Sequence, residues 1–181
     1  MKQVYIINEN HPKLLLFFAG WAADETPFKQ YHPKDTDYMI CYDYRTPDFD
    51  TSVFDRYRQI NVVAWSMGVW AGSLILSQVP REKIFSIAFN GSTSPIDNLE
   101  GIPVQTYQAT LDGLTPAFIG SNDRIFPPEN LEMNHDNLMC NNVILTDSAH
   151  YDASMFRFLL QDMWEMPIDD FMHHLKSINI E

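Results

Sequence analysis

Cysteines, basic side chains and long apolar runs are all scarce in this sequence of 181 residues. The two cysteines, Cys41 and Cys140, form neither a disulfide framework nor a metal-binding spacing. Each lies beside a strand-like apolar run, so we expect both to be buried free thiols. Lys and Arg number 12 against 24 Asp and Glu, and the net charge of -12 disfavours nucleic acid and anionic membrane surfaces as partners. No apolar run approaches the roughly 20 residues that a membrane span needs.

The amino terminus and the overall composition narrow the class of protein further. Residues Met1 to Tyr5 lack the long apolar core of a signal peptide, and together with the scarce cysteines this predicts a cytoplasmic protein. The apolar fraction of 45% and the aromatic fraction of 13% indicate a packed globule rather than a disordered chain. The length predicts a single domain, residues 1–181, with enough chain for a sizeable core. We expect no cofactor and no metal ion.

Short apolar runs alternate with helix-like segments along the whole chain. This alternation predicts an α/β fold with a mainly parallel sheet and helices on both of its faces. The expected strands are Val4–Ile7, Leu14–Ala19, Tyr38–Tyr44, Ile60–Ala64, Ile84–Phe89, Ala117–Ile119 and Val143–Leu145. The expected helical segments are Ser52–Arg58, Val69–Gln78, a segment from Pro127 or Pro128 toward Met139, Asp152–Trp164 and Ile168–Leu175.

One serine stands where an apolar run changes abruptly into a helix-like segment. Ser66 follows the run Ile60–Ala64 and precedes Val69–Gln78, which is the arrangement of a nucleophile elbow. The sharp corner needs small residues two positions before and two after the serine, and Ala64 and Gly68 supply them. The usual pattern has glycine at both positions, so Ala64 is a mild departure. The alternative is that Ser66 merely caps an ordinary helix.

Two further polar residues follow later strands in the order of an α/β-hydrolase triad. Asp123 comes after the sixth expected strand and His150 after the seventh. Because parallel strands present their carboxyl ends at one edge, we expect Ser66, Asp123 and His150 to meet there as nucleophile, orienting acid and base. Asp123 alone has the alternative role of capping a turn. Asp147 is a rival acid, although it lies close to His150 along the chain.

The remaining histidines are expected to be solvated, because they lie in polar or terminal stretches. They are His11, His32, His135, His173 and His174.

Ester hydrolysis also needs donors for the negative oxygen of the tetrahedral intermediate. The residue after the serine, Met67, is expected to supply one backbone N–H. Trp21, in the loop after the second strand, is expected to supply the other, and Gly20 allows close approach of that backbone. The alternative is that Trp21 is a core aromatic; its indole is also a candidate wall for the acyl pocket.

Six strings of residues along the chain look like those of a known family. They are Phe18-Ala19-Gly20-Trp21, Cys41-Tyr42-Asp43-Tyr44, Val63-Ala64-Trp65-Ser66-Met67-Gly68-Val69-Trp70, Asn90-Gly91, Gly101-Ile102-Pro103 and Asp123-Arg124-Ile125-Phe126-Pro127-Pro128-Glu129-Asn130. Together they resemble the BioG-type pimeloyl-[acyl-carrier-protein] methyl esterases of the α/β-hydrolase superfamily, from about Leu15 to His150. That family is similar in turn to the BioH-type esterases, which do the same job in biotin synthesis.

The resemblance implies that the methyl ester of pimeloyl-carrier protein is hydrolysed with release of methanol. It implies attack by Ser66, proton transfer by His150 and orientation by Asp123. It further implies substrate binding by Gly20, Trp21 and Phe126, and an acyl-carrier protein as the partner. The alternatives are a general short-chain carboxylesterase or thioesterase and a non-catalytic α/β-hydrolase-like binding protein.

One segment departs from the family pattern. Family members carry a helical lid that engages the carrier protein, and it is expected between Thr115 and Pro116, where this sequence passes directly to the next strand. Either the chain is lidless or the sequence omits the lid, and omission is favoured because the family-like segments stop and restart abruptly. A truly lidless chain would favour small esters as substrates. The segment Met166–Glu181 matches no part of the family pattern; the alternatives are a piece of an additional domain and a species-specific tail.

Overall fold

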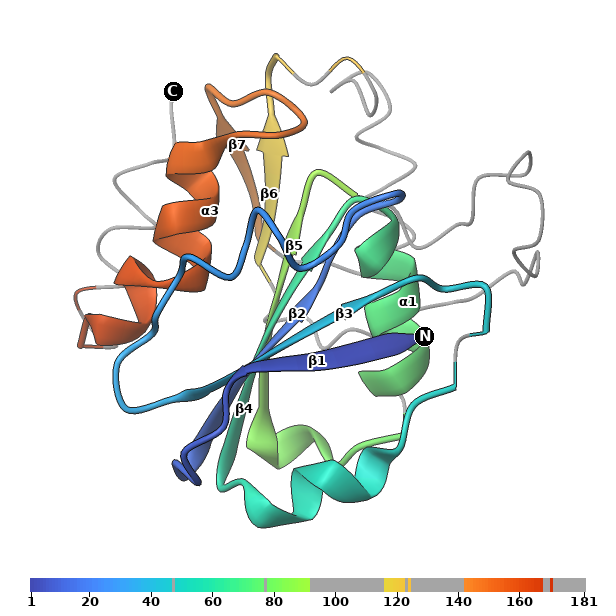
Figure 1. Ribbon diagram of the computed structural model, residues 1–181. Helices are drawn as coiled ribbons and strands as arrows, with labels where there is room; N and C mark the ends of the chain where they lie inside the picture. Colours follow the sequence, from blue (N-terminus) through green and yellow to red (C-terminus); the bar gives the residue numbers. More distant parts are fainter. Residues whose placement is uncertain are drawn as a thin grey trace.

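A seven-stranded sheet forms the centre of the computed structural model, with the order β1-β3-β2-β4-β5-β6-β7 (Figure 1). All seven strands predicted from the sequence are confirmed. They are β1 (Lys2–Ile7), β2 (Lys13–Phe18), β3 (Asp37–Tyr42), β4 (Gln59–Trp65), β5 (Ile84–Phe89), β6 (Pro116–Gly120) and β7 (Asn142–Thr146). The structure describes residues 1–46, 48–76, 78–91, 116–122, 124, 142–167 and 170.

The sheet is mainly parallel, as its sequence pattern predicts. Strand β1 pairs antiparallel with β3, and the other neighbouring pairs are parallel. Strands β2 to β7 therefore all end at the same edge of the sheet, which we call the carboxyl edge. The opposite edge, where these strands begin, is called the amino edge.

Two helices cover opposite faces of the sheet (Figure 1). Helix α1 (Met67–Leu76) packs on the face to which the side chains of Leu14 and Leu16 of β2 point. Helix α3 (Ala153–Leu160) packs on the face that receives Leu15 and Phe17. Successive strand side chains point to opposite faces, so a continuous apolar run such as β2 fills both cores at once. Leu14 to Phe18 are completely buried.

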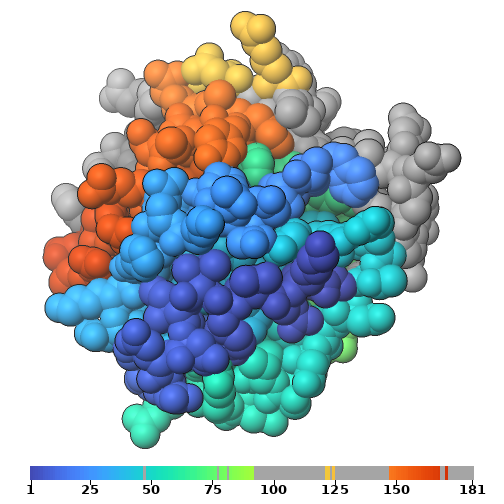
Figure 2. Space-filling model, in the orientation of Figure 1, coloured from blue at the N-terminus to red at the C-terminus, as the bar shows by residue number. Residues whose placement is uncertain are grey.

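The loop after β2 closes one end of the second core. In Figure 2 its lighter blue atoms lie beside the orange carboxyl-terminal part of the molecule. Phe28 from this loop packs edge-on against Phe156 of α3, with ring centroids 5.1 Å apart. The same ring lies 6.4 Å from that of Tyr151. These aromatic contacts fix the loop against the segment that follows β7.

Two helix predictions differ from the structure. The predicted helix Asp152–Trp164 is broken at Gln161, whose φ of -138° and ψ of -70° are not helical. Helix α3 therefore ends at Leu160, and a short 3-10 helix, η4 (Asp162–Glu165), follows. The predicted segment Ser52–Arg58 is also a 3-10 helix, η1 (Thr51–Arg56), which Asp50 caps by accepting a hydrogen bond from Ser52 N. A third 3-10 helix, η2 (Arg81–Lys83), precedes β5.

Several predictions fall outside the described residues. They concern Asp123, Phe126, Cys140, the helices near 127–139 and 168–175, and the lid expected beside Thr115. Cys41, by contrast, is described; its thiol is free and completely buried, as predicted. Within the described ranges, no helix combines the length and the apolar character needed to span a membrane.

Candidate active site

Ser66 occupies a strained corner between β4 and α1. Its φ is 57°, in the left-handed region that non-glycine residues seldom adopt. The corner is fixed on both sides: Ser66 N donates to Phe89 O of β5 at 3.1 Å, and Ser66 O accepts from Val69 N at 3.1 Å. A strained residue at a functional site must be held by its surroundings, and these two bonds hold the serine at the carboxyl edge.

Gly68 is needed because the first turn of α1 packs directly on the backbone of β2. A Cβ atom at this position would lie 2.1 Å from Phe18 O, much closer than non-bonded atoms approach. Ala64, two residues before the serine, is tolerated as the last but one residue of β4, where it is 7% exposed. The sequence departure at Ala64 is therefore accommodated within the strand.

His150 meets Ser66 although the two residues are far apart in the chain. Its Nε2 lies 3.0 Å from Ser66 Oγ, which is the range needed for proton transfer between a nucleophile and its base. His150 lies in the loop after β7, and Ser66 follows β4. Two of the three residues of the expected triad are thus brought together, and their catalytic roles stay a prediction.

The third residue of that triad, Asp123, lies outside the described residues. Its rival Asp147 is described: Asp147 Oδ1 accepts a hydrogen bond from Asn122 Nδ2 at 2.5 Å. The expectation that His11 is solvated is wrong. Its Nδ1 lies 3.0 Å from the buried Oδ1 of Asp37, because the turn after β1 folds His11 back onto the start of β3.

Of the two residues predicted to bind the oxyanion, Met67 directly follows the nucleophile, and Trp21 follows Gly20, which packs against the elbow. Met67 is the first residue of α1, so its backbone N–H has no acceptor within the helix. Gly20 lies against the elbow: a Cβ atom there would be 3.1 Å from Ser66 Cβ and 2.9 Å from the Trp65 ring. The backbone of Trp21 follows directly. Its side chain is 43% exposed, so the alternative of a core aromatic is wrong.

A cavity of about 360 Å³ lies beside this loop at the carboxyl edge. Its lining combines the loop after β2 with the loop after β3: Gly20, Trp21, Ala22, Ala23, Tyr42, Asp43, Tyr44 and Arg45. Tyr44 ties the two loops together, since its hydroxyl donates to Ala19 O at 2.6 Å and lies 3.0 Å from Cys41 O. The cavity therefore adjoins Trp21, one of the two predicted oxyanion donors, whereas Ser66, Met67 and His150 are not among the described residues that line it.

Charged groups at the rim of this cavity are paired with one another. Hydrogen bonds from the Arg45 guanidinium lower the pKa of Asp43 to about 2. A hydrogen bond with the Glu25 carboxylate raises the pKa of Tyr42 to about 12. Asp43 is thus an anion and Tyr42 a neutral phenol at neutral pH. Sequence reasoning did not assign these residues, because the expected strand Tyr38–Tyr44 included both of them, whereas β3 ends at Tyr42.

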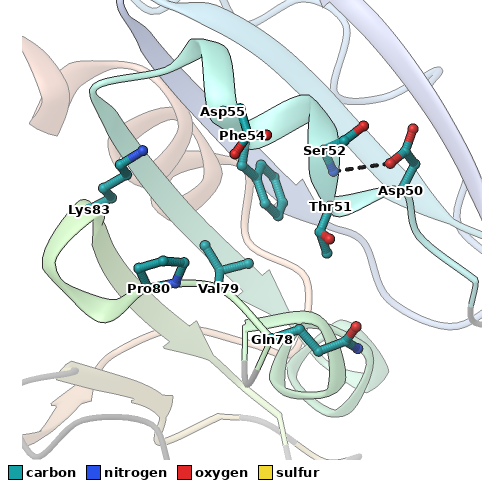
Figure 3. A pocket seen from close by; sticks show the side chains of 9 residues that line it. All are labelled: Asp50, Thr51, Ser52, Phe54, Asp55, Gln78, Val79, Pro80 and Lys83. Carbon is teal, nitrogen blue, oxygen red and sulfur yellow. Dashed lines mark hydrogen bonds between the residues drawn. The ribbon is translucent and has the colours of Figure 1, made fainter.

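A second cavity, of about 350 Å³, lies at the amino edge and is unrelated to the serine (Figure 3). It is formed by η1 and the connection from α1 to β5, with Asp50, Phe54, Val79 and Lys83 among its lining residues. Figure 3 shows Asp50 turned toward the backbone of Ser52 rather than offering its carboxylate to the cavity.

The mainly parallel sheet and the serine elbow define an α/β-hydrolase. Among solved structures of this fold, a lipase-esterase related protein from Clostridium acetobutylicum is similar, with a TM-score of 0.57 at 12% identity over 98% of this chain and 97% of that one. At this identity the likeness concerns the fold alone. The chain belongs to the BioG family: the family model described as pimeloyl-ACP methyl esterase BioG matches residues 1–117.

Two relatives support the family assignment. The crystal structure of BioG from Haemophilus influenzae superimposes with a TM-score of 0.68 at 25% identity, covering 90% of this chain and all of that one. A protein from Bacteroides fragilis named malonyl-[acyl-carrier protein] O-methyltransferase is 35% identical over 200 residues, which include 79% of this chain and 40% of the relative. The chain thus spans less than half the length of that relative.

The Bacteroides alignment also bears on the segment that departs from the family pattern. Its 200 positions exceed the 181 residues of the whole chain. The relative therefore contains residues within the matched region that have no counterpart here. This agrees with an insertion in the Bacteroides relative.

Proposed function

We propose that this chain is a serine esterase that hydrolyses the methyl ester of pimeloyl-[acyl-carrier protein]. The observation that carries the proposal is the distance of 3.0 Å between Ser66 Oγ and His150 Nε2 at a serine whose φ is 57°. Membership of the BioG family supports the same reaction. The reaction produces methanol and a free carboxylate at the distal end of the acyl chain.

In the first half of the reaction, Ser66 Oγ attacks the ester carbonyl carbon while His150 Nε2 accepts the serine proton. The carbonyl oxygen becomes negative and is stabilised by the backbone N–H groups of Met67 and Trp21. Loss of one such donor typically costs on the order of 3 kcal/mol in the barrier. When the intermediate collapses, the carbon–methoxy bond breaks, His150 returns the proton, and methanol leaves an acyl-enzyme on Ser66.

In the second half, water takes the place of methanol. His150 removes a proton from the water, the oxygen attacks the acyl carbon, and the same two N–H groups bind the second oxyanion. Collapse breaks the bond to Ser66 Oγ, which recovers its proton from His150. The orienting acid is assigned to Asp123, as the order of the triad predicts. Asp147 is the alternative, although its carboxylate is engaged by Asn122.

The substrate class is supported by the names of the relatives taken together. The family description concerns removal of a methyl ester from an acyl-carrier protein, and the Bacteroides relative is named for adding a methyl group to one. We assign the acyl chain to the cavity beside Trp21, because its volume of about 360 Å³ suits a small ligand. Gly20, Trp21 and Phe126 are its predicted contacts.

The proposal is tested by the release of methanol from pimeloyl-[acyl-carrier protein] methyl ester. We expect turnover by the purified chain, no turnover by Ser66→Ala, and rescue of a biotin-requiring strain by the wild type alone. Turnover of short free esters with no preference for the carrier-bound substrate would favour a general carboxylesterase or thioesterase. Absence of any ester turnover would favour the non-catalytic binding protein.

The same experiment tests the role of the lid when carrier-bound and free methyl esters are compared as substrates. The lid expected beside Thr115 is proposed to provide the contacts for the carrier protein. If this chain lacks them, a methyl ester of free pimelic acid should be cleaved about as well as the carrier-bound one. A strong preference for the carrier-bound ester would show that other surfaces of the chain bind the carrier.

A further inference from the structure

The loop that carries His150 is held by donors from three neighbouring strands. Trp65 ends β4, Asn90 follows β5, and Asn122 lies two residues beyond β6. Each of them contacts the segment 147–150, which follows β7. A loop without its own ladder of hydrogen bonds is mobile unless its surroundings fix it, so these contacts decide how precisely His150 is placed.

The first contact comes from the strand that also carries the nucleophile. Trp65 Nε1 donates to His150 O at 2.7 Å. The indole ring lies 5.4 Å from the imidazole ring and 5.0 Å from the ring of Phe156, centroid to centroid. Trp65 is the residue directly before Ser66. Any displacement of the end of β4 therefore moves the nucleophile and the support of its base together.

The second contact comes from a strained asparagine. Asn90 Nδ2 donates to Ala149 O at 2.9 Å and lies 3.5 Å from His150 O. Asn90 is 2% exposed and has a φ of 45°. Of the described non-glycine residues with positive φ, only Ser66 and Asn90 are buried. With this backbone conformation, the Asn90 amide contacts the loop that carries His150.

The third contact fixes the beginning of the same loop. Asn122 N donates to Ser148 O at 3.1 Å, and its side chain donates to Asp147. Ser148 is 2% exposed. The start of the segment 147–150 is thus held by Asn122, which follows β6. Its end, where His150 lies, is held by Trp65 of β4 and by Asn90, which follows β5.

We infer that Trp65 and Asn90 are positioning residues that act through the backbone of residues 149 and 150 to keep the imidazole in reach of the serine hydroxyl. This inference rests on the proposed roles of Ser66 and His150. A backbone carbonyl held by two donors fixes the Cα–Cβ direction of its residue, and therefore the path of the ring. Misplacement of a catalytic group by about 1 Å can cost about 100-fold in rate, so loss of either donor reduces reactivity without removing a catalytic group.

The test uses the second-order rate at which a fluorophosphonate labels Ser66, measured beside the melting temperature. Trp65→Phe keeps one aromatic ring and removes the N–H donor together with part of the indole surface, a loss of surface that the control Trp164→Phe described below shares. Asn90→Gly removes the amide and accepts a positive φ. We expect each variant to be labelled about 10- to 100-fold more slowly than wild type, and to hydrolyse esters with a lower kcat and a nearly unchanged KM.

Each variant has a matched control elsewhere in the chain. Trp164→Phe removes an indole that donates to a backbone carbonyl, Leu159 O, at the same distance of 2.7 Å. Asn10→Gly removes an asparagine at a φ of 63° in an exposed turn. Both controls are expected to be labelled at the wild-type rate, whatever they do to the melting temperature.

The outcomes separate this inference from the proposed function. Labelling of wild type but not of Ser66→Ala supports the proposed function. If Trp65→Phe and Asn90→Gly are then labelled as fast as wild type, the positioning role is wrong and the proposed function stands. If the controls slow labelling as much as the test variants, the contacts are merely structural and the inference fails. If Trp65→Phe does not fold, Asn90→Gly decides. Absence of labelling in wild type overturns both proposals.

Discussion

Each edge of the sheet brings a histidine together with a polar partner, but the two pairs differ in physical character. At the carboxyl edge, His150 meets the hydroxyl of Ser66, on a residue with strained backbone. At the amino edge, His11 meets Asp37, whose Oδ1 also accepts the backbone N–H groups of Glu9 and His11 at 2.9 and 3.2 Å.

The amino-edge pair is saturated with hydrogen bonds. The other oxygen, Asp37 Oδ2, accepts from the Tyr57 hydroxyl at 2.9 Å and lies 3.5 Å from Arg56 Nη2. Burial raises the pKa of Asp37, but the hydrogen bonds from Glu9, His11 and Tyr57 outweigh it, and the pKa lies below its ordinary value of 3.8. The buried carboxylate of Asp37 is hydrogen-bonded at both oxygens, and it joins the turn after β1, the start of β3 and the end of η1. A histidine–carboxylate contact alone therefore does not identify an active site.

Replacement of each histidine by glutamine is expected to give the largest difference between the two edges. His150→Gln is expected to lower ester turnover by about 10⁶-fold, because the serine loses its base. His11→Gln is expected to leave turnover unchanged and to lower the free energy of unfolding by about 1 kcal/mol, through a lost hydrogen bond. Turnover assays and urea unfolding measure the two effects. A reversal of the pattern would place the active site at the amino edge.

The carboxylates give the next largest effect. Asp123→Asn is expected to lower turnover by about 10⁴-fold with the fold retained, because the base would be held in the wrong tautomer. Asp147→Asn is the matched control and is expected to have little effect. If the two results were exchanged, Asp147 would be the orienting acid.

Gly68→Ala tests whether the elbow depends on close packing. The added methyl group would overlap Phe18 O, which belongs to the backbone and cannot rotate away. We expect the free energy of unfolding to fall by roughly 3 kcal/mol or more, in the range of severe overpacking. A melting temperature equal to that of wild type would mean that α1 does not pack on β2 as described.

Asp37→Asn tests the amino edge through pH. A carboxylate whose pKa is lowered by folding stabilises the folded state above its ordinary pKa of 3.8, and this contribution is lost as the pH falls through the lowered value. We expect wild type to lose stability in this acidic range and the variant to lose less. At neutral pH the variant should be less stable by about 1 to 3 kcal/mol, with unchanged turnover. Parallel pH–stability curves for the two proteins would contradict the role of Asp37.

Ala64→Gly is expected to have the smallest effect. The variant restores the more usual glycine before the nucleophile but adds backbone freedom to a central strand, for a cost of about 0.5 to 1 kcal/mol. Turnover should change less than threefold. A large gain in turnover would mean that the methyl group of Ala64 strains the elbow.

The sequence predicted the features that depend on local pattern. Apolar runs predicted all seven strands, and the small residues around Ser66 predicted the corner. The break at Gln161 escaped prediction because apolar residues continue at helical spacing into η4, while the backbone at Gln161 turns away. The contact of His11 with Asp37 escaped because it joins a turn to a strand 26 residues later, and nothing in the local sequence marks such a partner.

The hydrogen bonds that hold the loop of His150 could not be predicted from the sequence either. Trp65 and Asn90 donate to main-chain carbonyls, and a carbonyl is present at every residue whatever its side chain. Both residues stand at strand ends of the carboxyl edge, so the sequence indicated their region but not their target. The described residues leave the carboxylate of the triad as a prediction.

The central claim is that Ser66 is a nucleophile activated by His150. It is tested most directly by treating the folded chain with a fluorophosphonate and locating the adduct by mass spectrometry. We predict a single adduct on Ser66 that is formed by wild type and by His11→Gln, and that is lost in Ser66→Ala and strongly slowed in His150→Gln. An adduct on another residue, or equal labelling of the His150→Gln variant, would contradict the account.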